Sequence, residues 1–232
     1  MSNKNLISVI MSAYNNENTI KQSLDSILNQ TYKNIEILVI DDFSTDTTFE
    51  ILKDYSLKFK NLKIFQNNEN IGLTRSLNKL INLSSGFYIA RQDADDISKN
   101  NRLEYQHKYI TKNKLDFCTS RAINIQTGNS MRLITYYVPK KILVNYKNPF
   151  IHGTLLIKKN VLKEIGGYDE DFYYSQDYKL FDTLLTKRYK YKNIFKPLYY
   201  LNTINNISTN KKEIQSYYAY CVKNKLIPDG RK

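Results

Sequence analysis

Three aspartates lie within four positions of the chain, directly after an apolar segment. Asp93, Asp95 and Asp96 follow residues 86–90 (GFYIA), whose composition is typical of a buried strand. Mg²⁺ and Mn²⁺ prefer oxygen ligands and bind one or two protein carboxylates together with water and substrate phosphate oxygens. A solvated turn or a helix N-cap is the other interpretation of an isolated Asp-x-Asp pair. The position at a strand end favours a site for a divalent cation and a diphosphate.

Two further polar clusters follow short apolar segments earlier in the chain. Residues 12–15 (SAYN) come at the end of the first such segment, and Asp41 and Asp42 at the end of the second. Parallel sheets bind ligands outside the carboxyl ends of their strands. If these strands are parallel, both clusters converge with the three later aspartates on one edge of the sheet. We therefore expect a ligand site at that edge.

Two residues of these clusters have chemistry that suits a nucleotide base. Tyr14 can stack on a planar base, although it can also be a core aromatic. Asp42 can accept a hydrogen bond from a ligand N–H, such as the imide of uracil. The Asp41-Asp42 pair can equally cap the following helix, whose dipole favours an acid there, and both roles can hold, one residue each. Both alternatives remain open for each residue.

The first half of the chain predicts a regular α/β arrangement. The predicted strands are residues 6–13, 35–40, 61–67 and 86–90. A helix with an apolar face separates each pair of strands. Strands and helices that alternate at this spacing predict a Rossmann-like, mostly parallel sheet with helices on both faces.

The second half is less regular. It predicts helices at 100–113, 176–187 and 212–226, and a short helix that ends at Gly166-Gly167. It also predicts a hairpin of strands 116–125 and 131–137, a strand at 150–158 and an extended segment at 191–202. Pro197 indicates an edge or a bulge in the last segment. We find no repeat or linker and expect one domain over residues 1–232. It comprises a nucleotide-sugar-binding half at about 6–99, an acceptor-binding half at about 100–205 and a basic C-terminal helix within 206–232.

The chain has a strong positive excess and only two cysteines. Lys and Arg number 35 against 22 Asp and Glu, a net charge of +13, which suits an anionic partner such as nucleic acid, a phosphorylated small molecule or a membrane surface. Cys118 falls in a predicted strand and Cys221 in a predicted helix, so we expect two reduced, buried thiols and a cytoplasmic protein. We see no secretory signal and no apolar stretch long enough to span a membrane.

Several motifs resemble family 2 glycosyltransferases of the inverting, GT-A-fold type. They are SVIMSAYNNENTIKQSLDSILNQTYKNIEILVIDDFSTDTT, NIGLTRSLN, GFYIARQDADD with Arg102-Leu103 after it, FIHGTLLIKKNVLKEIGGYDEDF and YSQDYKLFDTLL. The resemblance covers about residues 6–190 in the order of the family, and it implies a GT-A-like fold with a smaller acceptor-side subregion.

The resemblance implies a role for each matching donor-side residue. Ser12, Tyr14 and Asp42 would hold the base, by stacking for Tyr14 and at the uracil imide for Asp42, with Asn15 beside them. Asp93, Ala94 and Asp95 correspond to the Asp-x-Asp motif of the family. Asp95 would bind Mn²⁺ or Mg²⁺ directly, and Asp93 would face the ribose or the donor sugar. The residues carried over here are Ser12, Tyr14, Asn15, Asp42, Asp93, Ala94 and Asp95. For Asp96, which lies outside the motif, we expect contact with the residues that hold the cation, or a helix cap.

The acceptor side is carried over in the same way. Asp177 would be the general base, and Gln176 stands where the family usually has Glu, which puts in doubt any role that needs a charge there. The resemblance places His152 at the donor diphosphate or the acceptor pocket, and it places the loop of Gly167 and Tyr168 beside the acceptor. A structural role is the alternative for His152. Two arginines near the proposed phosphate region complete the set: Arg75, and Arg91, which can instead pair with the aspartates.

The predicted function is therefore metal-dependent, inverting transfer of a sugar from a nucleotide sugar, expected to be UDP-linked. The acceptor would be a hydroxyl of a glycan or lipid-linked saccharide in bacterial surface polysaccharide synthesis (capsule, lipopolysaccharide or lipooligosaccharide). Such a transfer needs one base opposite the leaving group and one cation to offset the charge of the leaving diphosphate.

Two alternatives belong to other functional classes. A sugar nucleotidyltransferase would need a glycine- and Lys/Arg-rich phosphate loop, which SAYNNENT lacks. A nucleic-acid-binding protein without enzymatic activity fits the charge, yet no binding module is visible and the acidic clusters would repel phosphate. We expect no nucleic-acid partner. The basic C-terminal helix predicts peripheral contact with an anionic inner membrane, or simply a helix packed on the domain.

Overall fold

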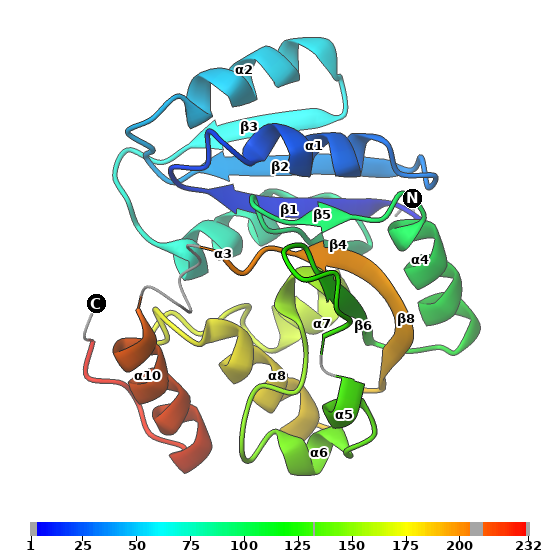
Figure 1. Ribbon diagram of the computed structural model, residues 1–232, viewed down its shortest axis with the longest axis vertical. Coiled ribbons are helices and arrows are strands. Elements are labelled where there is room, and N and C mark those ends of the chain that lie inside the picture. Colours follow the sequence, from blue (N-terminus) through cyan, green and yellow to red (C-terminus); the bar gives the residue numbers. More distant parts are fainter. Residues whose placement is uncertain (1–3, 132, 205–210, 231–232) are drawn as a thin grey trace.

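The computed structural model describes residues 4–131, 133–204 and 211–230. Figure 1 shows a curled sheet with helices on both of its faces. In the described residues eight strands form one sheet in the order β3-β2-β1-β4-β7-β6-β8-β5. This confirms the predicted α/β class with a mostly parallel sheet.

The first half follows the prediction closely. Its elements are β1 (Ile7–Ala13), α1 (Ile20–Leu28), β2 (Ile35–Asp41), α2 (Thr48–Lys58), β3 (Leu62–Gln66), α3 (Leu73–Leu83) and β4 (Tyr88–Arg91). The pairs β1–β2, β2–β3 and β1–β4 are all parallel. Consequently the carboxyl ends of β1, β2 and β4 lie at the same edge of the sheet.

Both faces of this sheet are buried. Side chains alternate along β1, so Val9 and Met11 join one apolar cluster with α1 and α2, while Ile10 joins a second cluster with α3. Helices of the second half complete both clusters: α4 (Arg102–Lys112) the first, and α7 (Lys159–Glu164), α8 (Gln176–Thr186) and α10 (Lys212–Asn224) the second. Burial on both faces explains why the strands have almost continuous apolar sequences.

The second half completes the sheet with strands of both directions. Its elements are β5 (Ile97–Ser98), α4 (Arg102–Lys112), β6 (Phe117–Asn124), α5 (Leu133–Tyr136), α6 (Lys140–Leu143), the 3-10 turn η1 (His152–Thr154), β7 (Leu156–Lys158), α7 (Lys159–Glu164), α8 (Gln176–Thr186), β8 (Tyr191–Leu201) and α10 (Lys212–Asn224). β7 is antiparallel to β4 and β6, β5 is antiparallel to β8, and β6 and β8 are parallel. The register of β6 and β8 shifts where Arg121 pairs with Pro197, so the predicted bulge is confirmed.

Two predictions in this half were wrong. The hairpin is absent from the described residues, because its second strand is the helix α5 and only an isolated bridge joins Ile123 to Ser130. The strand predicted at 150–158 is reduced to β7. The strand begins late because the 3-10 turn occupies residues 152–154. The hydroxyl of Thr154 stabilises this turn through hydrogen bonds to the carbonyls of Ile151 (2.7 Å) and Ser120 (3.2 Å).

Helix α10 packs on the domain. It buries Tyr218, Cys221 and Val222 in the cluster that also contains α8 (Figure 1). The apolar face predicted for a membrane is therefore covered by protein, and residues 205–210, 231 and 232 lie outside the described part of the chain. Both cysteines are free and buried, as predicted. No helix in the described residues combines the length and apolar character needed to cross a membrane.

Candidate active site

The three polar clusters predicted from the sequence meet at the carboxyl edge of the sheet. Ala13 pairs with Asp41 in the β1–β2 ladder, and Ile10 pairs with Arg91 in the β1–β4 ladder. Beyond these pairs, the N–H of Asp42 donates to the carbonyl of Ala13 (2.8 Å). The convergence follows from the parallel topology, as predicted.

Hydrogen bonds join the loop after β1 to the loop after β2. Asn15 has a left-handed φ of 52°, and its side-chain oxygen accepts from the N–H of Thr45 (2.9 Å). Its own N–H donates to the hydroxyl of Ser44 (3.0 Å), which in turn donates to Asp41 (2.5 Å). Asn15 therefore shapes these loops. Ser12 lies half-buried on β1, and Tyr14 is 47% exposed, so the ring of Tyr14 is available to a ligand.

Asp42 is buried, and its carboxylate organises the start of α3. It accepts hydrogen bonds from the side-chain amide of Asn67 (2.8 Å) and the N–H groups of Ile71 (3.0 Å) and Gly72 (2.8 Å). The predicted alternative, a cap on the helix that follows Asp42, was wrong, because Asp46 accepts from the N–H of Thr48 there (2.9 Å). Three of about four lone-pair positions of Asp42 are thus used, which leaves one for a ligand.

The acidic cluster of Asp93, Asp95 and Asp96 carries more negative charge than its surroundings balance. Asp93 pairs with the buried Arg91 at 2.5 Å. Burial and the charge of Asp93 raise the pKa of Asp95 to about 6, despite an opposing effect of Arg91. Burial, together with Asp93 and Asp95, raises the pKa of Asp96 well above its usual value.

Asp96 and Asp93 share a partner on β8. The hydroxyl of Tyr199 accepts from the N–H of Asp93 (3.1 Å) and hydrogen-bonds to Asp96, which also accepts from the N–H of Asn202 (2.7 Å). Asp96 thus holds β8 against the cluster. The helix-cap alternative for Asp96 was wrong, since these partners come from β8 and the residues after it.

The residues present fit a divalent cation that is completed by a ligand. No group of three His, Cys, Asp or Glu side chains in the described residues could hold a metal by itself. Mg²⁺ and Mn²⁺ commonly use one or two carboxylates plus phosphate and water, however. Asp95 and Asp93 supply such a pair, and the raised pKa of Asp95 is the effect that a nearby cation would reverse. Ala94 between them is buried, and its side chain offers no ligand atom.

A buried arginine behind the cluster was missed as a functional residue. Arg102 is fully buried on α4 and donates to the side chains of Gln92 (3.0 Å) and Ser98 (2.7 Å) and to the carbonyl of Arg91 (2.6 Å). Burial lowers its pKa to about 10. Arg102 therefore fixes the backbone that carries the acidic cluster. The available signal was Arg102-Leu103 in the family-like segment.

His152 and Tyr168 approach the acidic cluster from the other half of the chain. Nε2 of His152 lies 2.7 Å from the hydroxyl of Tyr168. Burial and the charge of Arg91 lower the pKa of His152 well below its usual value, so the imidazole is neutral. A Cβ on Gly153 would lie 2.8 Å from a carboxylate oxygen of Asp93, so the backbone of this turn contacts the cluster.

Tyr168 also connects the cluster to Asp177. It is buried, and its pKa is raised by burial and further by the charges of Asp177 and Asp93, while Arg91 opposes the shift. The structure thus brings Asp93, Tyr168 and Asp177 into one neighbourhood. Asn78 of α3 holds this loop, with its side-chain oxygen accepting from the N–H of Tyr168 (2.9 Å). Gly167 adopts a φ of +81°, and a Cβ there would collide with Asn78 at 2.6 Å.

Asp177 lies in the first turn of α8. One of its oxygens accepts from the side-chain amide of Asn148 (2.6 Å), and the other accepts from the N–H of Tyr178 (2.7 Å). Gln176 before it is buried, and Ser175 begins the helix in a left-handed conformation. Asn148 was also missed, because a lone Asn before Pro149 has no distinctive signal.

Arg75 lies on the base side of the site. It is 56% exposed and pairs with Glu170 at 3.4 Å. The pKa of Tyr173 is raised by burial, and this tyrosine responds to the charges of Asp42, Tyr14 and Arg75. Its ring packs on the backbone of Gly72 so closely that a Cβ there would be 2.4 Å away. Tyr173 is a further missed residue of this side.

Comparisons with known proteins all identify glycosyltransferases. The model described as Glycosyl transferase family 2 matches residues 8–166. The putative glycosyltransferase EpsE of Bacillus subtilis is 37% identical over 165 residues, which cover 70% of this chain and 59% of that protein. The O-antigen biosynthesis glycosyltransferase WbnJ of Escherichia coli is 34% identical over 223 residues, covering 91% of this chain and 85% of that protein.

Solved structures share the fold. S. aureus TarS (residues 1–349) in complex with UDP superposes with a TM-score of 0.74 at 22% identity, covering 85% of this chain and 60% of that one. The mannosyltransferase PcManGT from Pyrobaculum calidifontis in complex with GDP-Man and Mn²⁺ superposes with a TM-score of 0.68 at 21% identity, and the match covers 82% of this chain and 54% of that one. This chain thus spans only about 60% of the length of EpsE and of the TarS chain.

Proposed function

The chain belongs to glycosyltransferase family 2, and from that premise we propose that it transfers a sugar from a nucleotide-sugar donor to an acceptor hydroxyl with inversion. The family membership favours sugar transfer over a nucleotidyltransferase or a nucleic-acid-binding protein. We propose UDP as the nucleotide. The UDP complex of TarS, whose fold is shared, supports this choice.

The donor nucleotide would bind at the ends of β1 and β2. Tyr14 would stack on the base, since its ring is 47% exposed at the strand end. Asp42 would accept the imide N–H with its remaining lone pair, because its other positions are held by backbone and amide donors. Ser12 would line the same pocket from β1.

The diphosphate would lie over the acidic cluster. Asp95, with Asp93, would hold Mn²⁺ or Mg²⁺, and the cation would offset the charge that develops on the departing diphosphate. Arg91 would keep the carboxylate of Asp93 oriented, because the two groups pair at 2.5 Å. The PcManGT complex contains Mn²⁺, which supports a divalent cation in this fold.

Asp177 would take the proton from the attacking hydroxyl. Asn148 orients its carboxylate, and the N-terminus of α8 favours its charged form. An inverting transfer needs such a base on the face opposite the leaving group. The observation that supports this arrangement most is that the hydroxyl of Tyr168 lies 2.7 Å from Nε2 of His152, which is in the same turn as Gly153, whose backbone contacts Asp93.

The acceptor would be a glycan or lipid-linked saccharide of a surface polysaccharide. WbnJ, named for O-antigen biosynthesis, supports this class. His152, Gly167, Tyr168 and Gln176 would border the acceptor or the diphosphate. We place the reaction in the cytoplasm. Peripheral membrane contact would involve the lysines and the exposed Tyr220 of α10, because Tyr218, Cys221 and Val222 are packed on the domain.

A donor screen tests this proposal. The chain is incubated with UDP-, GDP- and dTDP-sugars and Mn²⁺, and release of nucleoside diphosphate is measured with and without a chelator. We expect turnover with UDP-sugars that chelator abolishes, and thermal stabilisation by UDP with Mn²⁺ beyond that by either alone. Stabilisation by single-stranded RNA that is insensitive to chelator, without donor turnover, would contradict it.

A further inference from the structure

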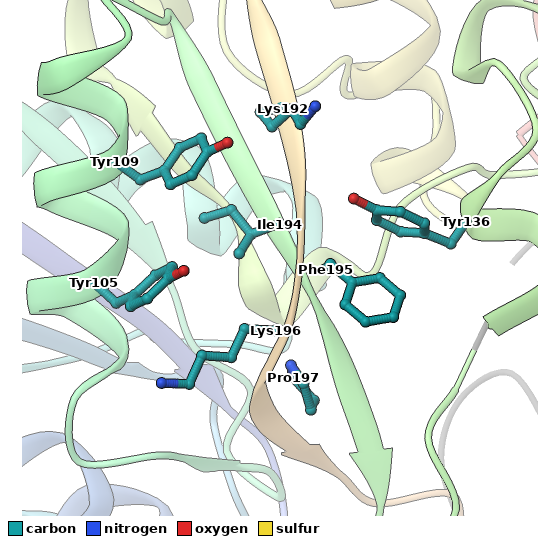
Figure 2. Close-up of a pocket in the computed structure, with 8 residues that line it drawn as sticks. All are labelled: Tyr105, Tyr109, Tyr136, Lys192, Ile194, Phe195, Lys196 and Pro197. Carbon is teal, nitrogen blue, oxygen red and sulfur yellow. The ribbon is translucent and has the colours of Figure 1, made fainter.

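A cavity lies away from the proposed transfer site, along the outer edge of β8. It is an open groove of about 490 Å³. Figure 2 shows β8 crossing it, with α4 on one side and Tyr136 of α5 on the other. Its lining includes four aromatic residues and two lysines: Tyr105, Tyr109, Tyr136, Phe195, Lys192 and Lys196.

Aromatic rings form both walls of this groove. Tyr105 and Tyr109 are nearly parallel, at 17° with centroids 6.4 Å apart. Across the strand, Tyr136 and Phe195 pack edge to face at 5.0 Å, and Phe195 is 48% exposed. Flat faces with polar rims suit ligands that present one apolar face and several hydroxyls, and sugar rings have this character.

The groove is positively charged. Lys192 and Lys196 line it and no carboxylate does, and the ammonium of Lys196 lies 5.0 Å from the ring centroid of Tyr105. Arg121 lies behind Phe195, with its guanidinium 4.5 Å from that ring. This arginine is 95% buried, its Nε has no hydrogen-bond partner, and it takes part in none of the ion pairs among the described residues. Lys192 and Lys196 are therefore the two cations that line the groove, and the buried Arg121 adds positive charge behind Phe195, which favours an anionic ligand.

The backbone of β8 adds further polar groups. Between Tyr191 and Pro197 the strand pairs with β6 on one edge, and no other described strand pairs with the opposite edge. Free N–H and C=O groups there can bind hydroxyls. An added peptide strand is disfavoured, because lysines and a proline on an edge oppose strand pairing. A concave aromatic surface also suits a sugar better than a flat membrane surface.

We propose that this groove is a second saccharide site that binds sugar rings bearing carboxylate or phosphate groups. It is distinct from the transfer site, since the lining residue nearest to that site along β8, Pro197, lies two residues, or about 7 Å, before the fully buried Tyr199, which contacts Asp93. The site requires no catalysis and stands independently of the donor and base assignments.

Binding of a labelled acidic oligosaccharide tests the proposal directly. We would measure fluorescence anisotropy with a labelled hexamer of galacturonate. The Tyr105→Ala/Lys196→Ala variant should raise Kd by at least about tenfold. Since Tyr105 is half-buried, the Lys192→Glu/Lys196→Glu variant, with both changes on exposed side chains, should give the same loss without affecting the core. The matched control is Tyr220→Ala/Lys223→Ala on the exposed side of α10, which should bind like the wild type.

The anisotropy results distinguish an acidic-saccharide site from other ligands of the same lysines. Weak binding of neutral maltohexaose and salt-sensitive binding of the acidic hexamer would support the proposal. It would be overturned by no measurable wild-type binding, by unchanged binding in both groove variants, or by equal binding of maltohexaose. Binding of oligo-dT or of phosphatidylglycerol vesicles through the same lysines, without the saccharide, would also overturn it. Thermal stabilisation by UDP and Mn²⁺ should be the same in all variants, so failure of the donor assignment is measured separately.

Discussion

The two ends of the central sheet both contain buried carboxylates, and these carboxylates are in opposite electrostatic states. Glu36 lies at the amino end of β2. It accepts hydrogen bonds from the hydroxyl of Ser8 (2.6 Å), the N–H of Ser85 (2.6 Å) and the ammonium of Lys63 (3.2 Å). Burial alone would raise the pKa of Glu36, but these bonds outweigh it and lower the pKa to about 2. This carboxylate is fully compensated by the protein.

The acidic cluster at the carboxyl end lacks such compensation. Burial and mutual repulsion raise the pKa of Asp95 to about 6, although Arg91 lies nearby, and raise the pKa of Asp96 well above its usual value. A carboxylate with its own donors stabilises the fold, whereas a group with surplus charge is stabilised only when a cation binds. The difference separates a structural acid from a binding-site acid without reference to any relative.

The largest expected effect is on turnover in the Asp95→Ala variant. Loss of a metal ligand should reduce donor turnover by about a thousandfold, because the diphosphate then leaves without its cation. At pH 7 the free energy of unfolding should rise by about 1–2 kcal/mol, because a carboxyl with a raised pKa destabilises the folded state when ionised. Donor turnover is measured by release of nucleoside diphosphate, and the free energy of unfolding by urea titration. The control is Asp54→Ala, a change at an exposed aspartate. Unchanged turnover in Asp95→Ala would show that the acidic cluster is not a binding site.

The Asp177→Asn variant should lose about a hundredfold to a thousandfold in kcat, because an amide cannot accept the acceptor proton. Its free energy of unfolding should fall by only about 1 kcal/mol, since the amide oxygen can accept from Asn148 or from the N–H of Tyr178 but not from both. Binding of UDP with Mn²⁺, measured by calorimetry, should remain at the wild-type level. Full transfer activity in this variant would refute the assignment of Asp177 as the base.

Glu36→Gln should act on stability and leave catalysis intact. We expect the free energy of unfolding to fall by about 2 kcal/mol, because Lys63 loses its charged partner and one of the donors faces an amide group. The kcat of the folded enzyme should match the wild type. A loss of kcat without a loss of stability would show that the amino end also belongs to the site.

The pH dependence of stability should show the same contrast. The pKa of Glu36 falls from 4.5 to about 2 on folding, so its stabilisation is complete above pH 4.5 and disappears as pH falls towards 2. The stability difference between wild type and Glu36→Gln should therefore shrink over this window in urea unfolding series. A difference that stays constant from pH 5 to the most acidic point would contradict the lowered pKa.

The sequence predicts the first half of the molecule because local signals and packing agree there. Strands 6–13 and 35–40 are almost wholly apolar, and both faces of the sheet are in fact covered. The convergence at the strand ends follows from parallel topology alone. The hairpin prediction failed because residues 133–136 (LITY) have strand-like composition but form the helix α5.

The site was predicted unevenly for a similar reason. Asp93 and Asp95 follow a strand and give a local signal. Asn148 and Tyr173 give none, because their contacts with Asp177 and Gly72 come from elements distant in sequence. The position of Asp42 after a strand predicts a polar residue at the site. Its hydrogen bonds to the start of α3 could not be predicted, because the donors lie 25–30 residues further along the chain.

The smallest expected effect belongs to Gln176→Glu, which restores the acid usual in the family. Gln176 is 8% exposed, so the new carboxyl would be buried like Glu36, but next to Asp177 instead of among hydroxyl and ammonium donors. Repulsion should raise the proton affinity of both acids and reduce the free energy of unfolding by about 1 kcal/mol. We expect kcat at neutral pH to change by no more than about fivefold, because the base itself is retained. A gain or loss of a hundredfold or more would show that position 176 contributes a charge to the reaction. In that case compensation by local donors would not be enough to distinguish structural from functional acids in this fold.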